Sequence, residues 1–219
     1  MPFLSLTQGI HDMTTATRKR RLYKIDQLEP DARRLALERF QEWRNKTWDS
    51  YDNETVSEPM QYKLKEHYGL TNCELSWRLS CCQGDGVAFT GNPDIYQWVK
   101  HDEHLAMLYL KLSVYCRLLH QDDPQLSISI VSTSHHYSHY NTMHLEVTNC
   151  ASWDEEEHDG QELYQMQTDI EEYLQELIKD ISRDLERIGY DEIEYQSSEE
   201  YLNDNEYRFT ANGHRYKRK

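Results

Sequence analysis

Apolar residues recur every three or four positions along four stretches of the chain, which is the pattern of amphipathic helices. The predicted helices span residues 30–48, 54–68, 95–121 and 162–188. Pro30 suits a first helical position, and Gly69 and Gly189 are of the residue type that commonly follows a helix end. The last stretch has the most regular spacing, so it predicts a long helix with one buried side.

Other segments alternate between apolar and polar residues, which predicts half-buried strands. Residues 75–79 alternate, a Gln-Gly-Asp-Gly turn follows, and a short second strand completes a first hairpin. Residues 126–132 and 143–147 alternate again and predict a second hairpin, and short strands are expected at residues 193–195 and 206–210. We therefore expect an α+β fold, with an antiparallel sheet built from two hairpins plus short C-terminal strands and packed against several amphipathic helices.

The chain is expected to form one domain between two basic ends. Residues 1–21 lack periodicity and predict a flexible N-terminal arm, residues 22–213 predict a single α+β domain, and residues 214–219 a basic tail. The five cysteines include no Cys-x-x-Cys pair, which favours a reducing compartment over a disulfide framework. No stretch approaches the roughly 20 apolar residues of a membrane helix, so we expect a cytoplasmic protein without membrane contact.

Charge is distributed very unevenly along the chain. The formal net charge is −15, and residues 154–206, the acidic C-terminal part, hold 20 acidic residues against three basic ones, a local net charge of −17. Such a surface repels nucleic acid and anionic membranes and attracts basic proteins. We therefore expect a protein partner with a basic surface and no direct binding of nucleic acid, while the oligomeric state is left open.

Six carboxylates on the predicted C-terminal helix fall largely off its apolar stripe and would form a ridge roughly 40 Å long at 1.5 Å per residue. This carboxylate ridge, the candidate partner-binding surface, consists of Glu162, Asp169, Glu172, Glu176, Asp180 and Asp184. The competing interpretation is an ordinary solvated helix face, because runs of charge usually serve only solubility.

The Gln-Gly-Asp-Gly turn is the most unusual local chemistry in the chain. Two glycines flank Asp85, so the backbone can adopt positive φ on either side of a short carboxylate. If the second hairpin lies beside this turn, Asp85 and Gln83 would meet Tyr137 and His139, and a carboxylate that orients an imidazole supports acid–base chemistry or ligand binding. The competing interpretation is structural, with Asp85 accepting hydrogen bonds from nearby amides.

Histidines gather around the second hairpin, at His135, His136, His139 and His144. A zinc site needs a defined ligand geometry with oriented supporting groups, and this run shows no such spacing. We interpret it as an exposed loop, and we interpret His101 and His104, three apart on a predicted helix, as part of a solvated face. Neither a metal nor a cofactor is therefore expected.

Three segments form short signatures. Residues 82–91 read Cys-Gln-Gly-Asp-Gly-Val-Ala-Phe-Thr-Gly, residues 137–143 read Tyr-Ser-His-Tyr-Asn-Thr-Met, and residues 205–213 read Asn-Glu-Tyr-Arg-Phe-Thr-Ala-Asn-Gly. In this order they resemble the signatures of a family of uncharacterised phage and prophage proteins, some described as antitoxin-like. That family usually has Ser in place of Cys82 and Asp in place of Asn212. The resemblance implies a phage-related origin, and hence the cytoplasm of a host cell, but no particular chemistry.

Three functional hypotheses stay open. The leading one is a non-enzymatic, phage-encoded protein that binds and inhibits a host defence or regulatory protein, itself nucleic-acid-binding, through the carboxylate ridge. The second is a small enzyme, or a ligand- or metal-binding module, with its site between the Gln-Gly-Asp-Gly turn and the Tyr-Ser-His hairpin. The third is an antitoxin-like regulator that acts through the basic segments at residues 18–21 and 215–219.

Overall fold

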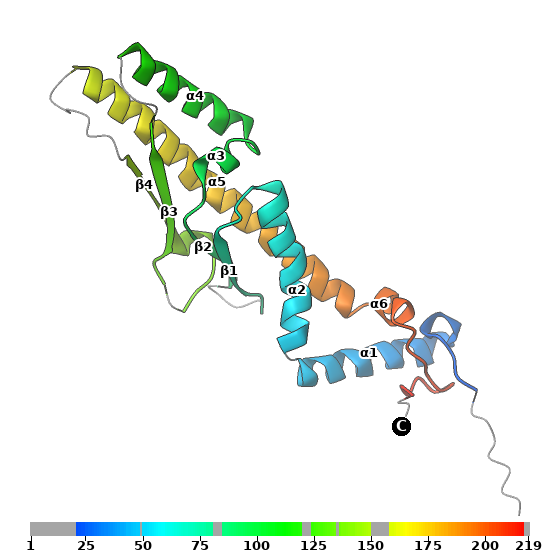
Figure 1. Ribbon diagram of the computed structural model, residues 1–219. Coiled ribbons are helices and arrows are strands. Elements are labelled where there is room, and N and C mark those ends of the chain that lie inside the picture. Colours follow the sequence, from blue (N-terminus) through cyan, green and yellow to red (C-terminus); the bar gives the residue numbers. More distant parts are fainter. Residues whose placement is uncertain are drawn as a thin grey trace, which may run out of the picture. The chain divides into compact units, whose positions relative to one another are not determined.

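The computed structural model describes residues 21–48, 50–80, 85–119, 124–134, 136–149 and 158–216 (Figure 1). The chain divides into two compact units, a smaller one of Met1–Arg44 with Ser197–Lys219 and a larger one of Asn45–Gln196. The single α+β domain expected over residues 22–213 stays a prediction. The expected N-terminal arm lies almost entirely outside the described residues.

The larger unit contains a four-stranded antiparallel sheet in the order β1-β2-β3-β4. The strands are β1 (Cys73–Arg78), β2 (Gly86–Gly91), β3 (Leu126–Ser132) and β4 (Met143–Asn149). Each hairpin is paired along its whole length, from Cys73 opposite Gly91 and from Leu126 opposite Asn149, whereas β2 and β3 share the single register pair Gly91–Ile130. The predicted α+β class with two antiparallel hairpins is confirmed.

The long helix α5 (His158–Gln196) runs past the sheet and contacts β2 and β4 (Figure 1). The other helices of this unit are α2 (Ser50–Tyr62), a π-helix that continues it (Lys63–His67), α3 (Ile95–Trp98) and α4 (Glu103–Leu118). The helix predicted over residues 95–121 is thus two helices, because Asp102 caps a new start by accepting a hydrogen bond from the Leu105 N–H at 2.7 Å. None of the described helices has the length and apolarity needed to cross a bilayer.

The end of α5 differs from the prediction. The helix does not stop at Gly189 but continues to Gln196, so the strand expected at residues 193–195 is wrong. A Cβ at position 189 would stand 2.4 Å from Leu79 Cδ1 and 3.0 Å from Met60 Sδ. Glycine is therefore present because two side chains pack closely against the helix, and not because the chain turns there.

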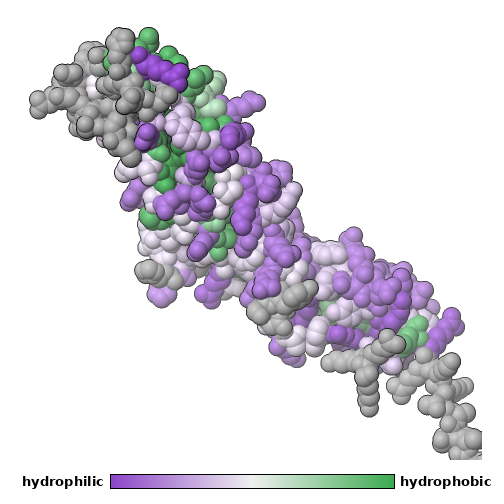
Figure 2. Space-filling view, in the orientation of Figure 1, coloured by the Kyte–Doolittle hydropathy of each residue, from purple (hydrophilic) through white to green (hydrophobic). Residues whose placement is uncertain are grey.

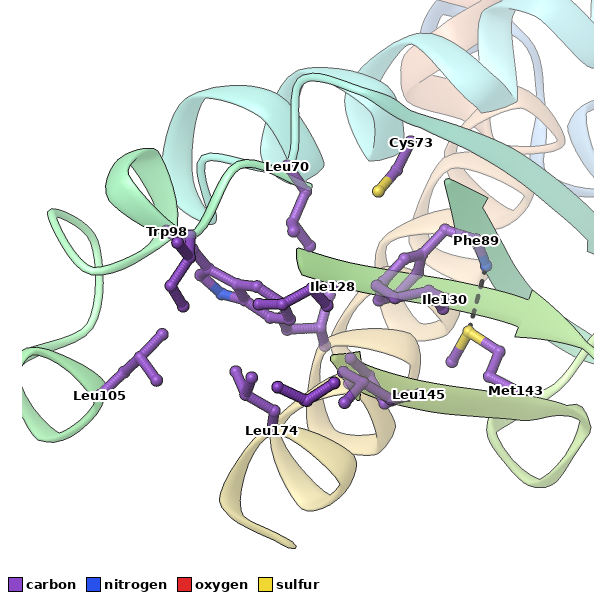
Figure 3. Close-up of a cluster of buried hydrophobic side chains, with 14 of the residues drawn as sticks. Leu70, Cys73, Phe89, Trp98, Leu105, Ile128, Ile130, Met143, Leu145 and Leu174 are labelled. Carbon is purple, nitrogen blue, oxygen red and sulfur yellow. Dashed lines mark hydrogen bonds between the residues drawn. The ribbon is translucent and has the colours of Figure 1, made fainter. Parts of the chain in front are cut away.

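The core of the larger unit lies where the sheet, α3 and α5 meet (Figure 3). Trp98 of α3, Phe89 of β2 and Leu174 of α5 are essentially inaccessible to solvent. The Phe89 N–H donates to Met143 Sδ at 3.2 Å, which links β2 to the start of β4. At about 25 cal/mol per Å² of apolar surface removed from water, this cluster is the main source of the unit's stability.

The smaller unit brings together the two ends of the described chain. It holds a 3-10 turn (Ile25–Gln27), most of α1 (Pro30–Thr47) and α6 (Glu199–Asp204). The strand expected at residues 206–210 is reduced to isolated bridges of the buried Phe209 with Tyr23 and with Arg215. The chain reverses at Gly213, whose φ is +73°, and the Thr210 N–H donates to the His214 carbonyl oxygen at 2.9 Å across this reversal.

Candidate functional site

The carboxylate of Asp85 closes the turn between β1 and β2. Its Oδ2 accepts hydrogen bonds from the Ser80 N–H at 3.0 Å and from the Ser80 hydroxyl at 2.6 Å, and its Oδ1 lies 3.5 Å from Arg78 Nε. The Asp85 side chain is only 5% exposed, so these contacts offset the cost of burying a charge. Residues 81–84, including the candidate Gln83, lie outside the described residues.

The second hairpin lies beside this turn, as the hypothesis of a shared site requires. A Cβ at Gly86, whose φ is +155°, would stand 2.8 Å from His139 Cβ and 3.0 Å from the Ser138 carbonyl oxygen, so glycine permits this approach. The hydroxyls of Ser138 and Ser76 are 3.4 Å apart. Tyr137 is exposed. The two candidate segments therefore meet at one end of the β1–β2 hairpin.

His139 serves the local backbone. Its Nδ1 accepts a hydrogen bond from the Asn141 N–H at 3.1 Å, which caps the 3-10 turn Tyr140–Thr142. With Nδ1 as an acceptor, Nε2 carries the proton of the neutral imidazole. The described hydrogen bonds of Asp85 and His139 thus stabilise the turn to which each residue belongs. This arrangement favours the structural interpretation of the Gln-Gly-Asp-Gly turn.

Metal ligation finds no geometric support in the described part of the chain, where no group of three or more His, Cys, Asp and Glu side chains is placed to hold an ion. His101 packs against Gly69, where a Cβ would stand 2.6 Å from His101 Cδ2. His104 stacks on Tyr173, with ring centroids 4.6 Å apart. Both histidines are exposed, as the interpretation of a solvated face expects, and each also makes a packing contact with another element.

Sequence reasoning also missed the hydrogen bond between Tyr173 of α5 and Asp102. The Tyr173 hydroxyl lies 2.9 Å from each oxygen of the Asp102 carboxylate, which also caps α4. Burial, together with this carboxylate, raises the pKa of Tyr173 to about 12. Asp102 borders a small hollow of about 160 Å³ that His67 and His101 also line. A hollow of this size has room for a few water molecules.

The carboxylate ridge lies on α5 as predicted, and most of it faces solvent. Its exposed members are Glu162, Glu172, Glu176 and Asp180, while Asp169 and Asp184 are half-buried. The basic residues of α5 each pair with the acid three positions earlier: Lys179 with Glu176 at 2.6 Å, Arg183 with Asp180 at 2.7 Å and Arg187 with Asp184 at 2.6 Å. The C-terminal half of the ridge is therefore compensated within the helix.

Asp184 is tied into the fold more tightly than the rest of the ridge. Its carboxylate accepts a hydrogen bond from the Tyr68 hydroxyl at 2.8 Å and lies 3.7 Å from Lys63 Nζ. Burial works to raise the pKa of Asp184, but the hydrogen bonds from Arg187 and Tyr68 and the charge of Lys63 outweigh it and lower this pKa. Asp184 therefore joins α5 to the π-helix, which leaves it less suited to a partner.

The N-terminal half of the ridge has a different charge pattern. Residues 158–178 contain six carboxylates and no Lys or Arg. Asp169 accepts a hydrogen bond from Gln165 at 2.9 Å, which leaves its charge intact. Glu172 is exposed and makes no ion pair with any described residue. Negative charge is therefore concentrated on the first half of α5.

Comparison with curated proteins gave no match, and neither did comparison with solved structures. The model of a domain of unknown function, DUF8835, matches residues 43–203. This match includes the whole sheet, α2 to α5, the Gln-Gly-Asp-Gly turn and the carboxylate ridge. Since it spans well over half of the sequence, the chain belongs to the DUF8835 family.

Proposed function

We propose that this protein is a non-enzymatic binding protein that contacts a partner with a basic surface through the first half of α5. The supporting observation is the charge pattern of that helix: residues 158–178 hold six carboxylates and no Lys or Arg, and Glu176 pairs with Lys179 of the next turn. Residues 179–196 hold six carboxylates together with Lys179, Arg183 and Arg187, which form ion pairs along the helix. Exposed charges that are predominantly of one sign steer a partner of opposite charge and set the orientation in which it docks.

The nature of the partner is proposed from the three signatures that resemble phage proteins. On this resemblance the chain is phage-encoded and acts in the host cytoplasm, and its partner is a host defence or regulatory protein whose basic site normally binds nucleic acid. A row of carboxylates along a helix offers such a site regularly spaced negative charge, as a phosphate backbone does. Occupation of the site would then inhibit the host protein.

Charge reversal with a matched control tests this proposal. One variant changes Glu162, Asp169, Glu172 and Glu176 to Lys. The control changes exposed acids elsewhere in the larger unit to Lys, namely Glu54, Glu58, Glu66 and Glu146, which alters the net charge equally. The immobilised full-length proteins are used to capture partners from host lysate at two salt concentrations. We expect the wild type and the control to capture the same protein, more weakly at high salt, and the ridge variant to lose it.

Equal capture by both variants would contradict the proposal, because the local carboxylates would then contribute no more than the overall charge. The inhibitory step is tested separately. Adding the wild-type chain should release the captured protein from a DNA duplex in a gel-shift assay, and the ridge variant should not. If instead the chain alone shifts DNA at low salt, the antitoxin-like hypothesis is favoured.

The contact between Gly86 and His139 supports a second candidate, a small-ligand site at the end of the β1–β2 hairpin. In this case Asp85 and His139 would be needed for binding rather than for folding. The variant Asp85→Ala, measured for both stability and ligand binding, separates these two roles.

A further inference from the structure

The β4 edge of the sheet is covered by side chains of α5. Gln175 Oε1 accepts a hydrogen bond from the Leu145 N–H at 3.0 Å, and Gln175 Nε2 donates to the Met143 carbonyl oxygen at 3.4 Å. Gln167 Nε2 donates to the Val147 carbonyl oxygen at 3.2 Å. These two side chains occupy three of the outward backbone groups that an additional strand would need, which hinders the extension of β4 by another chain.

The β1 edge lacks this cover. On β2, the Phe89 N–H donates to Met143 and the Val87 carbonyl oxygen accepts from Ser182 of α5, so both residues direct backbone groups away from β1. Their register partners are Leu75 and Trp77, which must therefore direct their own N–H and C=O groups toward the outer edge. None of the described residues forms a hydrogen bond with those groups.

A hollow of about 670 Å³ runs along this edge. It is lined by every residue from Leu75 to Ser80, and also by Trp48, Asn53 and Ile193. Hydrogen bonds hold the two indole rings of the hollow in place, since Trp48 Nε1 donates to Asn53 and Trp77 Nε1 donates to Ser57, each at 2.7 Å. The open backbone edge therefore adjoins free space with a preformed aromatic wall, as an incoming strand requires.

The sequence of β1 is complementary to itself. If two copies of β1 run antiparallel with Ser76 on the two-fold axis, Leu75 of each copy lies opposite Trp77 of the other, and their open N–H and C=O groups bond to one another. Glu74 of each copy then lies opposite Arg78 of the other, in the positions where side chains approach most closely. Both of these charged residues are exposed. A shift of the axis to Leu75 would lose the two charge pairs.

We propose that the protein forms a symmetric dimer through its β1 strands, which joins the two four-stranded sheets into one continuous antiparallel sheet. The second copy's Trp77 would enter the hollow next to Leu75. Arg78 stays available for the new pair, because its side chain is 66% exposed although it lies near Asp85. The dimer goes beyond the proposed function and does not depend on the charge of α5.

A cysteine on the two-fold axis tests this pairing directly. Facing Cα atoms in a non-hydrogen-bonded antiparallel pair lie about 4.5 Å apart, which is within the range of a disulfide. In a background with Cys81, Cys82 and Cys150 changed to Ser, Ser76→Cys should give a covalent dimer on mild oxidation. Ser127→Cys is the control, because Ser127 is equally exposed but lies on the inner strand β3. A dimer yield no greater than that of the control would overturn the proposal.

Sedimentation equilibrium of the full-length chain provides a second, independent test. Glu74→Lys puts like charges opposite each other at two symmetric positions, so the dimer dissociation constant should rise about tenfold or more. Glu146→Lys makes the same charge change on β4 and should leave the dimer dissociation constant within about twofold of the wild-type value. A chain that stays monomeric at every concentration, or a dimer that Glu74→Lys does not weaken, would overturn the proposal. So would a dimer that is lost on changing Leu110 and Leu118 of α4 to Lys.

Discussion

Gly189 of α5 lies directly against Leu79, so that a Cβ at position 189 would stand 2.4 Å from Leu79 Cδ1. In a free helix, replacing Gly by Ala stabilises by up to about 1 kcal/mol. Here the added methyl would push Leu79 and the buried Met60 out of position, and overpacking costs about 1–3 kcal/mol. We therefore expect Gly189→Ala to lower the free energy of unfolding by about 1 kcal/mol, as measured by urea denaturation.

The same substitution in a Leu79→Ala background provides the control. With the Leu79 side chain shortened, most of the steric conflict is removed and the helix propensity of Ala remains. Gly189→Ala should then be neutral or stabilising relative to Leu79→Ala alone. An equal destabilisation in both backgrounds would show that the contact with Leu79 is not the reason for glycine.

Asp85→Ala tests whether the turn is structural. The substitution removes a nearly buried carboxylate and leaves the Ser80 N–H without its described acceptor, which costs about 1–3 kcal/mol. We expect a lower melting temperature in a thermal scan followed by circular dichroism. Glu146→Gln on β4 changes an exposed residue and should leave the melting temperature unchanged. An unchanged melting temperature for Asp85→Ala, combined with loss of a ligand, would favour the small-ligand site instead.

The two hairpins were predictable because their pattern is local. Residues Leu75 and Trp77 face the core while Ser76 and Arg78 face outward, so the period of two is visible in the sequence itself. The adjacency of the turn and the second hairpin was only a condition of the shared-site hypothesis, and the structure meets it because consecutive hairpins of one sheet lie close together. These features need no information about distant residues.

Other features depend on contacts that the sequence does not reveal. A glycine in a helical pattern is equally consistent with the end of the helix and with a side chain that packs closely against the helix backbone. At Gly189 only the position of Leu79 decides between these two explanations. Asp184 has the same sequence signal as Asp180. It becomes structural through Tyr68, which is 116 positions away in the chain. The cover of β4 by Gln175 is likewise a tertiary contact without a local pattern.

Asp184 and Asp180 should therefore respond differently to the same change. Asp184→Asn weakens contacts with Arg187, Lys63 and Tyr68 and should lower the free energy of unfolding by about 1 kcal/mol at pH 7. Asp180→Asn changes an exposed group and should stay within about 0.5 kcal/mol of wild type. Urea denaturation at several pH values measures both effects.

The pH dependence of the Asp184 effect follows from its lowered pKa. A carboxyl with a lowered folded pKa contributes stability that is complete above the unfolded value of about 3.9 and is lost as the pH falls below it. The difference between Asp184→Asn and wild type should therefore shrink below about pH 4. A difference that stays constant across this range would contradict the ionic role of Asp184.

Tyr173 should lose its phenolic proton at a higher pH in the folded protein than in the unfolded chain. Burial and the Asp102 carboxylate raise its pKa to about 12, so the neutral phenol is the form that the fold favours. The corresponding stability is complete below the unfolded pKa of about 10 and is lost as the pH rises toward the folded value. Stability should fall more steeply over this alkaline range in the wild type than in Tyr173→Phe. Tyr164→Phe removes an exposed hydroxyl, so its free energy of unfolding should fall with pH as steeply as that of the wild type.

Helix α4 carries apolar residues on its solvent-facing side as well as on its buried side. Met107, Leu110, Val114 and Leu118 are between 47% and 70% exposed and follow helical spacing. Apolar surface is visible in Figure 2 at the end of the larger unit where α4 lies. Changing Leu110 and Leu118 to Lys should leave the free energy of unfolding within about 0.5 kcal/mol and reduce the binding of a hydrophobic dye.

Leu112→Ala on the same helix is the matched comparison. Leu112 is completely buried, so its truncation should cost about 2–5 kcal/mol in urea denaturation. The contrast arises because Leu112 points into the core, whereas the neighbouring apolar residues of the outer side lose little water contact on folding. If the two Lys substitutions destabilised the protein as much as Leu112→Ala, the outer side of α4 would have to be covered in the native protein.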